Sequence, residues 1–389
     1  MSVPDPAPDP FPNASDTLLI TLMDPHAPPG GRELLSRLNA RALEALLGDG
    51  LTVHQLKKPD ARLGSALRGH LNGLDPSEIA QIVARVGAIS AGQVFVDGST
   101  LGHVVAPIKR AHPHVRVVTF FHNVEARFFL GAARAKRTAL SLGLLAANHA
   151  AERKAVRHSD AIVCLSARDG EGLRRLYGRG ADYISPLALD DALPSPRETA
   201  TPDSERYLLC VGGAFYANLH GVRWFAEAVA PRSPLPIMIV GRGMEILREE
   251  FRDSPNIRII GQTDDLASCY AGAYCVVAPV FEGSGMKTKV AEALMFGKRI
   301  IGTAEAFSGY DRDVVAAGWR AETAPEFLAA ISEAVKADLP GFDPLSRATY
   351  EASHSFAAAT RRMAEVMCLP QPYVRPCPQA CSPRQISRS

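Results

Sequence analysis

Residues 274–294, YCVVAPVFEGSGMKTKVAEAL, join an apolar run to a glycine-containing loop and then to a helical pattern. The run YCVVAP is short and continuously apolar, which is typical of a strand buried on both faces. Gly283 and Gly285 allow the next stretch of backbone to approach a ligand closely. The sequence therefore predicts a strand, a loop and a helix whose N-terminus suits a phosphate group.

The same alternation of apolar runs and helical patterns extends in both directions along the chain. Further runs that predict strands lie at 17–22, 53–56, 94–97, 115–121, 161–166, 207–211, 236–240, 257–260 and 299–303. Strands that alternate with helices form parallel sheets covered on both faces. We expect an α/β protein of two Rossmann-like, doubly wound domains, with ligands held in a cleft at the carboxyl ends of the strands.

The length of 389 residues fits two domains. A proline-rich stretch of low hydrophobicity separates the two sets of runs and predicts a linker. The expected divisions are a disordered N-terminal segment at 1–15, a first Rossmann-like domain at 16–190, a linker at 191–204, a second Rossmann-like domain at 205–346, a last helix at 347–368 and a disordered tail at 369–389.

The composition excludes several classes of protein. The formal net charge of +2 gives no overall field that would attract nucleic acid. No CxxC pair occurs, so neither a zinc site nor a disulfide framework is indicated, and we expect no metal. The N-terminus lacks the pattern of a signal peptide, and no apolar run approaches the ~20 residues of a membrane helix. These features favour a cytoplasmic protein, with at most peripheral contact at the inner face of a membrane.

The loop at 279–294 has two interpretations from its residues alone. It is either a glycine turn followed by a solvated Lys/Glu face, or a phosphate site with charges from Lys287 and Lys289 and a carboxylate, Glu292, for ribose hydroxyls. A P-loop is excluded because Met286 separates the glycine from the lysine. No G-x-G-x-x-G opens either half, which disfavours a dinucleotide-dependent dehydrogenase.

The stretch PVFEGSGMKTKVAEALMFGKRIIGT (279–303) resembles the donor-site signature of the retaining GT-B glycosyltransferases of family 4, and IRIIGQTDDLASCYAGAYCVVAP (257–279) resembles the segment before it. The resemblance implies a GT-B fold with an acceptor-side domain at 16–190, a nucleotide-sugar-binding domain at 205–346 and a last helix at 347–368 that crosses back to the first domain. It also implies metal-independent transfer of a hexosyl unit, with retention of configuration. The donor would be a UDP- or GDP-sugar used as substrate, without a cofactor. The acceptor would be a glycan or a lipid-linked molecule in bacterial surface polysaccharide or glycoconjugate synthesis.

The resemblance also implies a donor site. Glu292 would hold the ribose, and the remaining donor-binding residues would be Gly213, Ser284, Gly285, Met286, Lys287, Thr288 and Lys289. The family pattern G-R-x5-K-G departs here, since Ala214 and His220 stand where it has arginine and lysine. We hypothesise that Lys287 or Lys289, together with the helix N-terminus, replaces those two cations.

Loops after two strands of the second half are the expected place of the nucleobase. Their candidate residues are Arg242, Gly261, Gln262 and Thr263. The adjacent Asp264 and Asp265 are better explained as caps of the next helix.

The first half offers two candidate features. Gly30 and Gly31 form either a flexible turn or, by resemblance, a loop beside the donor phosphates and the acceptor. His122 ends a predicted central strand and Glu125 follows three residues later. A lone histidine is usually structural, but the resemblance places this one near the transferred sugar, and histidine can donate or accept a proton near neutral pH. We expect His122 to be catalytic and Glu125 to lie beside the acceptor.

The stretch 126–157 carries seven basic residues with interleaved Phe and Leu, opposed by one acid. It is either an ordinary helix with a solvated cationic face or a basic amphipathic surface for peripheral contact with anionic membrane. For the whole protein two alternatives stay open: a sugar-nucleotide epimerase of related fold and a non-catalytic nucleotide-sugar-binding protein.

Overall fold

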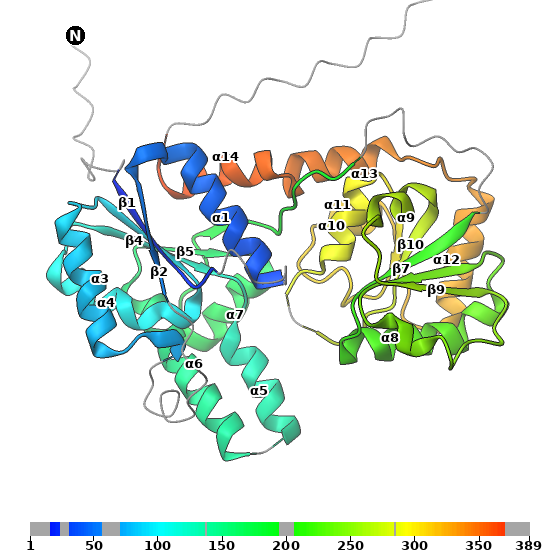
Figure 1. Ribbon diagram of the computed structural model, residues 1–389, viewed down its shortest axis with the longest axis horizontal. Helices are drawn as coiled ribbons and strands as arrows, with labels where there is room; N and C mark the ends of the chain where they lie inside the picture. The colour runs from blue at the N-terminus through cyan, green and yellow to red at the C-terminus, as the bar shows by residue number, and fades with distance from the viewer. Residues whose placement is uncertain are drawn as a thin grey trace, which may run out of the picture.

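The computed structural model describes residues 16–23, 31–56, 71–136, 138–193, 206–283 and 285–369. Two α/β domains lie side by side, each built on one sheet with helices packed against it (Figure 1). This arrangement confirms the predicted doubly wound class. Gly30, Ser284, the segments expected to be disordered at 1–15 and 370–389, and most of the expected linker lie outside the described residues.

The first sheet has the order β2-β1-β3-β4-β5-β6, and all its neighbouring strands are parallel. Its strands are β1 (Thr17–Thr21), β2 (Leu51–Gln55), β3 (Gln93–Asp97), β4 (Arg116–Phe121), β5 (Ala161–Cys164) and β6 (Tyr183–Ile184). The helices of this half are α1 (Gly31–Leu47), α3 (Pro76–Ala88), α4 (Val105–Ala111), α5 (Glu125–Lys136), α6 (Ala139–His158) and α7 (Ala167–Tyr177).

The second sheet has the order β12-β11-β10-β7-β8-β9 and is also parallel throughout. Its strands are β7 (Tyr207–Val211), β8 (Ile237–Val240), β9 (Ile257–Gly261), β10 (Ala273–Ala278), β11 (Ile300–Gly302) and β12 (Trp319–Arg320). The helices are α8 (Tyr216–Ala228), α9 (Leu266–Gly272), α10 (Thr288–Met295), α11 (Arg312–Ala316), α12 (Ala324–Lys336), α13 (Pro344–Thr349) and α14 (Phe356–Val366).

All the predicted runs form strands. β3, β4 and β10 are central and buried at every position, whereas the runs at 53–56 and 257–260 form the partly exposed edge strands β2 and β9. Each sheet gains one edge strand that the sequence did not predict, β6 and β12. Both have only two residues, which is too short for a hydrophobic pattern to register.

Strand order reverses once in each sheet, and this fixes where a ligand can bind. In the first sheet β1 lies between β2 and β3, and in the second β7 lies between β8 and β10. On the two sides of β1, and likewise of β7, the connecting helices lie on opposite faces of the sheet. This opens a crevice at the carboxyl ends of the strands. The loops after β1, β3, β7 and β10 are therefore the positions where function is expected.

The last helical segment returns to the first domain, as predicted. Helix α14 packs on α1, and Gln93 Nε2 donates to the Met367 carbonyl over 2.8 Å. The structure divides the expected helix at 347–368, because a π-helical turn at Tyr350–His354 interrupts it. Ser355 then starts α14, where its side chain accepts a hydrogen bond from Ala358 N. Within the described residues no helix combines the length and apolar character needed to cross a membrane.

A substitution at Gly221 of α8 tests how closely this helix packs against the loop after β10. A Cβ atom at this position would lie 1.8 Å from the Pro279 carbonyl oxygen. We expect Gly221→Ala to lower the free energy of unfolding by about 1–3 kcal/mol, because the helix must move away from the strand. Urea denaturation measures the change. Gly341→Ala is the matched control, since nothing lies within 4 Å of its Cβ position, and an equal loss in both variants would contradict the explanation.

Candidate functional site

Helix α10 begins at Thr288, directly after the loop that follows β10. Gly283 (φ +147°) and Gly285 (φ +67°) have backbone angles that favour glycine. Met286 faces the other domain, where its sulfur accepts a hydrogen bond from Leu187 N over 3.4 Å. The N-terminus of α10 is thus held at the crevice between β7 and β10, as the loop pattern predicted.

Lys289 carries a buried positive charge toward the loop after β7. Its side chain is on α10 and only 8 % of the residue is exposed. The ammonium Nζ lies 3.2 Å from Asn218 Oδ1, and a Cβ atom on Gly212 would come within 3.1 Å of it. Burial lowers the pKa of Lys289, and the nearby Glu292 carboxylate opposes that shift. This cation therefore lies where the loops after β7 and β10 meet.

Lys287 differs from Lys289 because its charge already has a partner. Its Nζ donates to Gly285 O over 2.8 Å and to Glu305 Oε1 over 2.9 Å. The other oxygen of Glu305 lies 3.3 Å from Arg168 Nη1, on α7 of the first domain. Lys287 and Lys289, which the sequence analysis treated as interchangeable candidates, thus have different partners in the structure.

The Arg168–Glu305 contact also orients the domains. Arg168 follows β5 and Glu305 follows β11, so loops from the carboxyl edges of both sheets touch. Arg168 makes a second contact across the boundary, to Ser308 Oγ. The carboxyl edges of the two sheets therefore face one another, as predicted.

Glu292 lies one turn further along α10. Tyr270 of α9, itself fully buried, donates to Glu292 Oε2 over 2.7 Å, and its ring stacks on Phe296. Burial raises the pKa of Glu292, while the Tyr270 hydrogen bond and the Lys289 charge oppose the rise. No described residue donates to the other oxygen, Oε1, so the carboxylate is fixed in place and retains one acceptor for a ligand.

The loops after β7, β8 and β9 are hydrogen-bonded into one surface. Ala214 N donates to Arg242 O, and Gly241 N to Gly261 O, each over 2.8 Å. The structure thereby brings Gly213, a donor-binding candidate, close to Arg242 and Gly261, two candidates for the nucleobase side. Arg242 is exposed.

Two of the nucleobase candidates already have structural partners. Gln262 N donates to Glu245 Oε1 over 2.6 Å, and Thr263 Oγ1 accepts from Asp265 N over 3.1 Å. Asp265 accepts from Ser268 N and so caps α9, as expected.

On the acceptor side, His122 follows β4 and pairs with a carboxylate that the sequence analysis did not single out. Its Nε2 lies 3.0 Å from Asp97 Oδ1, and both residues are buried. Asp97 ends β3 and accepts hydrogen bonds from Thr21 Oγ1 and Asn39 Nδ2. Burial alone would raise the pKa of Asp97, but His122 and the hydrogen bonds lower it well below its usual range.

Gly98 leaves an open place beside this pair. It has φ +135°, and a Cβ atom there would lie 3.8 Å from His122 Nδ1 and 3.7 Å from Arg32 Nη2. Arg32 Nη2 is buried without a hydrogen-bond partner among the described residues. Gly31 begins α1 just before Arg32, so the glycine loop brings a guanidinium next to the histidine.

Glu125 begins α5 near the same place. Burial raises its pKa, and the charges of Arg32 and His122 oppose the rise. Glu152 of α6, which the sequence analysis treated only as a lone acid, holds this helix start. Its oxygens accept from Glu125 N (2.7 Å), Ala126 N (3.1 Å) and Tyr177 OH (2.8 Å).

Glu152 gives stability a measurable dependence on pH. Burial raises its pKa to about 6, although four hydrogen bonds oppose the shift. The folded protein therefore binds this proton more tightly than the unfolded chain, and stability falls as pH rises from about 4.5 through about 6. We expect wild type to lose about 1 kcal/mol over this interval relative to Glu152→Gln. Chemical denaturation across the pH range measures it; parallel curves would show that Glu152 does not titrate there.

Comparison with known proteins agrees with this geometry. Residues 205–337 match the family model described as glycosyl transferases group 1. Similar solved structures include sucrose-phosphate synthase of Thermosynechococcus elongatus (TM-score 0.66, 16 % identity, covering 90 % of this chain and 97 % of that one) and HepE of Anabaena in complex with UDP (0.63, 12 %, 91 % and 99 %). WaaG, a glycosyltransferase involved in lipopolysaccharide biosynthesis, is a third (0.57, 15 %, 90 % and 97 %).

A search of curated proteins gave no match. At these identities the structural likeness shows the fold, which is GT-B over both domains. The family match shows the activity class and covers the domain that holds α10, Lys289 and Glu292. The chain is therefore a glycosyltransferase of GT-B fold whose second domain matches the glycosyl transferases group 1.

Proposed function

We propose that this protein transfers a hexosyl unit from a UDP- or GDP-sugar to a glycan or lipid-linked acceptor, with retention of configuration, in surface polysaccharide or glycoconjugate synthesis. The observation that carries the proposal is the joint position of Lys289, Glu292 and the start of α10 at the crevice between β7 and β10. The structures of HepE, which are complexes with UDP, with UDP and glucose, and with UDP-glucose, support a nucleotide-sugar donor.

The donor diphosphate would lie at the N-terminus of α10. Backbone N–H groups at a helix start and the positive end of its dipole favour a phosphate. Lys289 supplies a charge from one side, and among the described residues its hydrogen-bond partner is the neutral amide of Asn218 rather than a carboxylate. We assign to Lys289, rather than to Lys287, the role of the family cations that Ala214 and His220 replace.

The nucleoside would extend from the diphosphate toward the loops after β8 and β9. Glu292 Oε1 would accept hydrogen bonds from the ribose, since Tyr270 occupies only Oε2. The base would lie against Arg242 and the backbone of Gly261, Gln262 and Thr263. Main-chain groups are well suited to read the edge of a flat ring.

The transferred sugar would face His122 across the domain boundary. His122 Nε2 lies 3.0 Å from Asp97 Oδ1 but not in hydrogen-bond geometry. The charge of the carboxylate favours a proton on Nε2, which leaves Nδ1 for a sugar or acceptor hydroxyl. Asp97 and Glu152 are buried and already accept several hydrogen bonds, which makes them poor covalent nucleophiles. Retention would then require reaction on one face of the donor, with the leaving phosphate taking the acceptor proton.

The matched family consists of transferases, so we favour transfer over the epimerase and non-catalytic alternatives. Gly31 and Arg32 would complete the site from the first domain. Nη2 of Arg32 has no hydrogen-bond partner among the described residues. A phosphate or an acidic acceptor would provide one.

Lys289→Met tests the assignment of the diphosphate. We expect UDP binding to weaken by about 10- to 100-fold while uridine binding changes little, because only the phosphate contact is lost. Thermal shift or calorimetry with UDP and uridine measures the difference. Lys336→Met, an exposed lysine of α12, is the matched control, and an unchanged UDP affinity in Lys289→Met would refute the assignment.

Asp97→Asn tests the orientation of His122. We expect His122→Ala to lower kcat by about 10²–10⁴-fold, and Asp97→Asn to lower it in the same direction without changing the dissociation constant for UDP. Turnover of a UDP- or GDP-sugar, as transfer or as hydrolysis, gives the rate. Glu78→Gln is the control, since Glu78 pairs with His54 on β2 over 2.7 Å in a comparable contact. Normal turnover in Asp97→Asn would contradict a positioning role.

A further inference from the structure

One face of α6 presents a row of exposed and half-buried residues that divides into an apolar and a cationic half. We call it the α6 stripe. Its residues recur at helical spacing and come to lie on the same side of the helix. They are Leu142, Ala146, His149, Ala150, Arg153, Lys154, Arg157 and His158.

The cationic half of the stripe has no neutralising acid. No described acidic side chain forms an ion pair with Arg153, Lys154 or Arg157. Lys154 Nζ instead donates to His103 Nδ1 over 3.0 Å. Glu152, the acid nearest in sequence, is fully buried on the opposite face and binds the start of α5. The positive charge of the stripe is therefore open to an external anion.

The charged groups around His158 show the same excess of positive charge. Partial burial and the charges of Arg157, Arg110 and Lys154 all lower its pKa, and no acid opposes them. Arg110 lies on α4, so a second helix packed here adds to the same positive field.

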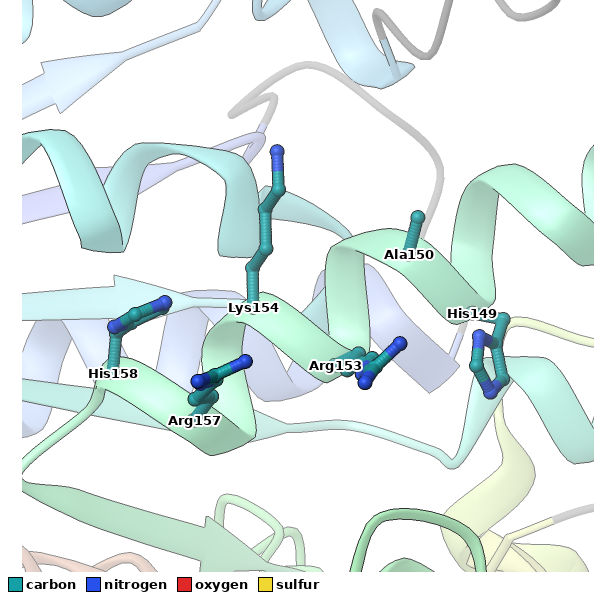
Figure 2. Close-up of a pocket in the computed structure, with 6 residues that line it drawn as sticks. All are labelled: His149, Ala150, Arg153, Lys154, Arg157 and His158. Carbon is teal, nitrogen blue, oxygen red and sulfur yellow. The ribbon is translucent and has the colours of Figure 1, made fainter.

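These side chains border an open hollow on the protein surface. Its volume is about 350 Å³, and its lining consists of His149, Ala150, Arg153, Lys154, Arg157 and His158. All six come from α6 and follow one another along it (Figure 2). The hollow is large enough for a phosphate group and its substituents.

The other half of the stripe is apolar and lies toward the end of the α5–α6 hairpin. Leu142 is 56 % exposed, and Leu140, one turn or less from the start of α6, is also exposed. In Figure 1 this hairpin projects from the body of the first domain. At 1.5 Å per residue, Leu142 lies about 16 Å along the helix axis from Arg153. The apolar end can thus enter a bilayer interface while the cations remain at the level of the headgroups.

We propose that the α6 stripe docks the protein on a bilayer that contains anionic phospholipid. Uncompensated cations match a surface of phosphate groups, and each contributes to binding near an anionic leaflet. Exposed leucines at the other end of the same stripe gain by entering the interface. Nucleic acid fits less well, because it offers no apolar region to Leu140 and Leu142.

Vesicle flotation of the full chain tests the proposal. Vesicles of phosphatidylcholine with phosphatidylglycerol are compared with vesicles of phosphatidylcholine alone. We expect binding only to the anionic vesicles, with loss as salt is raised. Arg153→Gln combined with Arg157→Gln should weaken binding roughly twentyfold to thirtyfold. Arg232→Gln combined with Arg258→Gln removes the same charge from exposed positions of the second domain and should bind as wild type.

Leu142→Asp tests the apolar half separately. It should weaken vesicle binding by about tenfold or more, while Ile246→Asp, at a position 58 % exposed in the second domain, should have no effect. UDP binding by all variants, measured by thermal shift, checks that they are folded and is independent of the docking result.

Three results would overturn the proposal. The first is absence of binding to anionic vesicles, and the second is equal binding to neutral vesicles. The third is binding of single-stranded RNA with the same dependence on Arg153 and Arg157 and no effect of Leu142→Asp, which would assign the stripe to nucleic acid.

Discussion

Both sheets of this protein are parallel throughout, and that constraint determines where everything else can be. Parallel strands all end at one edge, and each needs a crossover to return to the other. Every loop that could bind a ligand therefore collects at the carboxyl edge. The reversal of order at β1 and at β7 opens one crevice in each edge, and the contact between Arg168 and Glu305 turns the two edges toward each other.

The crevices contain charges that are costly to bury. Lys289 and Glu292 lie in one, and Asp97 and His122 lie in the other. Such groups are tolerated when hydrogen bonds or opposite charges compensate them. Asp97 is fully compensated by its neighbours. Lys289 has the charge of Glu292 nearby, but its hydrogen bond goes to an amide oxygen. Such a buried ammonium at the end of the crevice is consistent with the anionic ligand that we propose there.

Two sets of contacts couple the domains. Near the site, Glu305 bridges Lys287 and Arg168. Further away, Arg347 binds Asp191 in the segment between the domains and the Met295 carbonyl at the end of α10. The second set joins the crossover directly to the helix that carries Lys289. A change in the angle between the domains therefore acts on α10 at its N-terminal loop and at its C-terminal end.

The sequence by itself determined the α/β class, the central strands and the position of the donor loop, because continuous apolar runs and a glycine loop are local patterns. It also identified His122 and Glu292 as candidates, since each stands at or just beyond the end of a recognisable strand or loop. The tertiary structure alone decided their partners. Asp97 and Tyr270 are distant in sequence from the residues they orient, and no local pattern marks such pairs. It likewise separated Lys287 from Lys289, which are two residues apart but point to different partners because helix α10 turns between them.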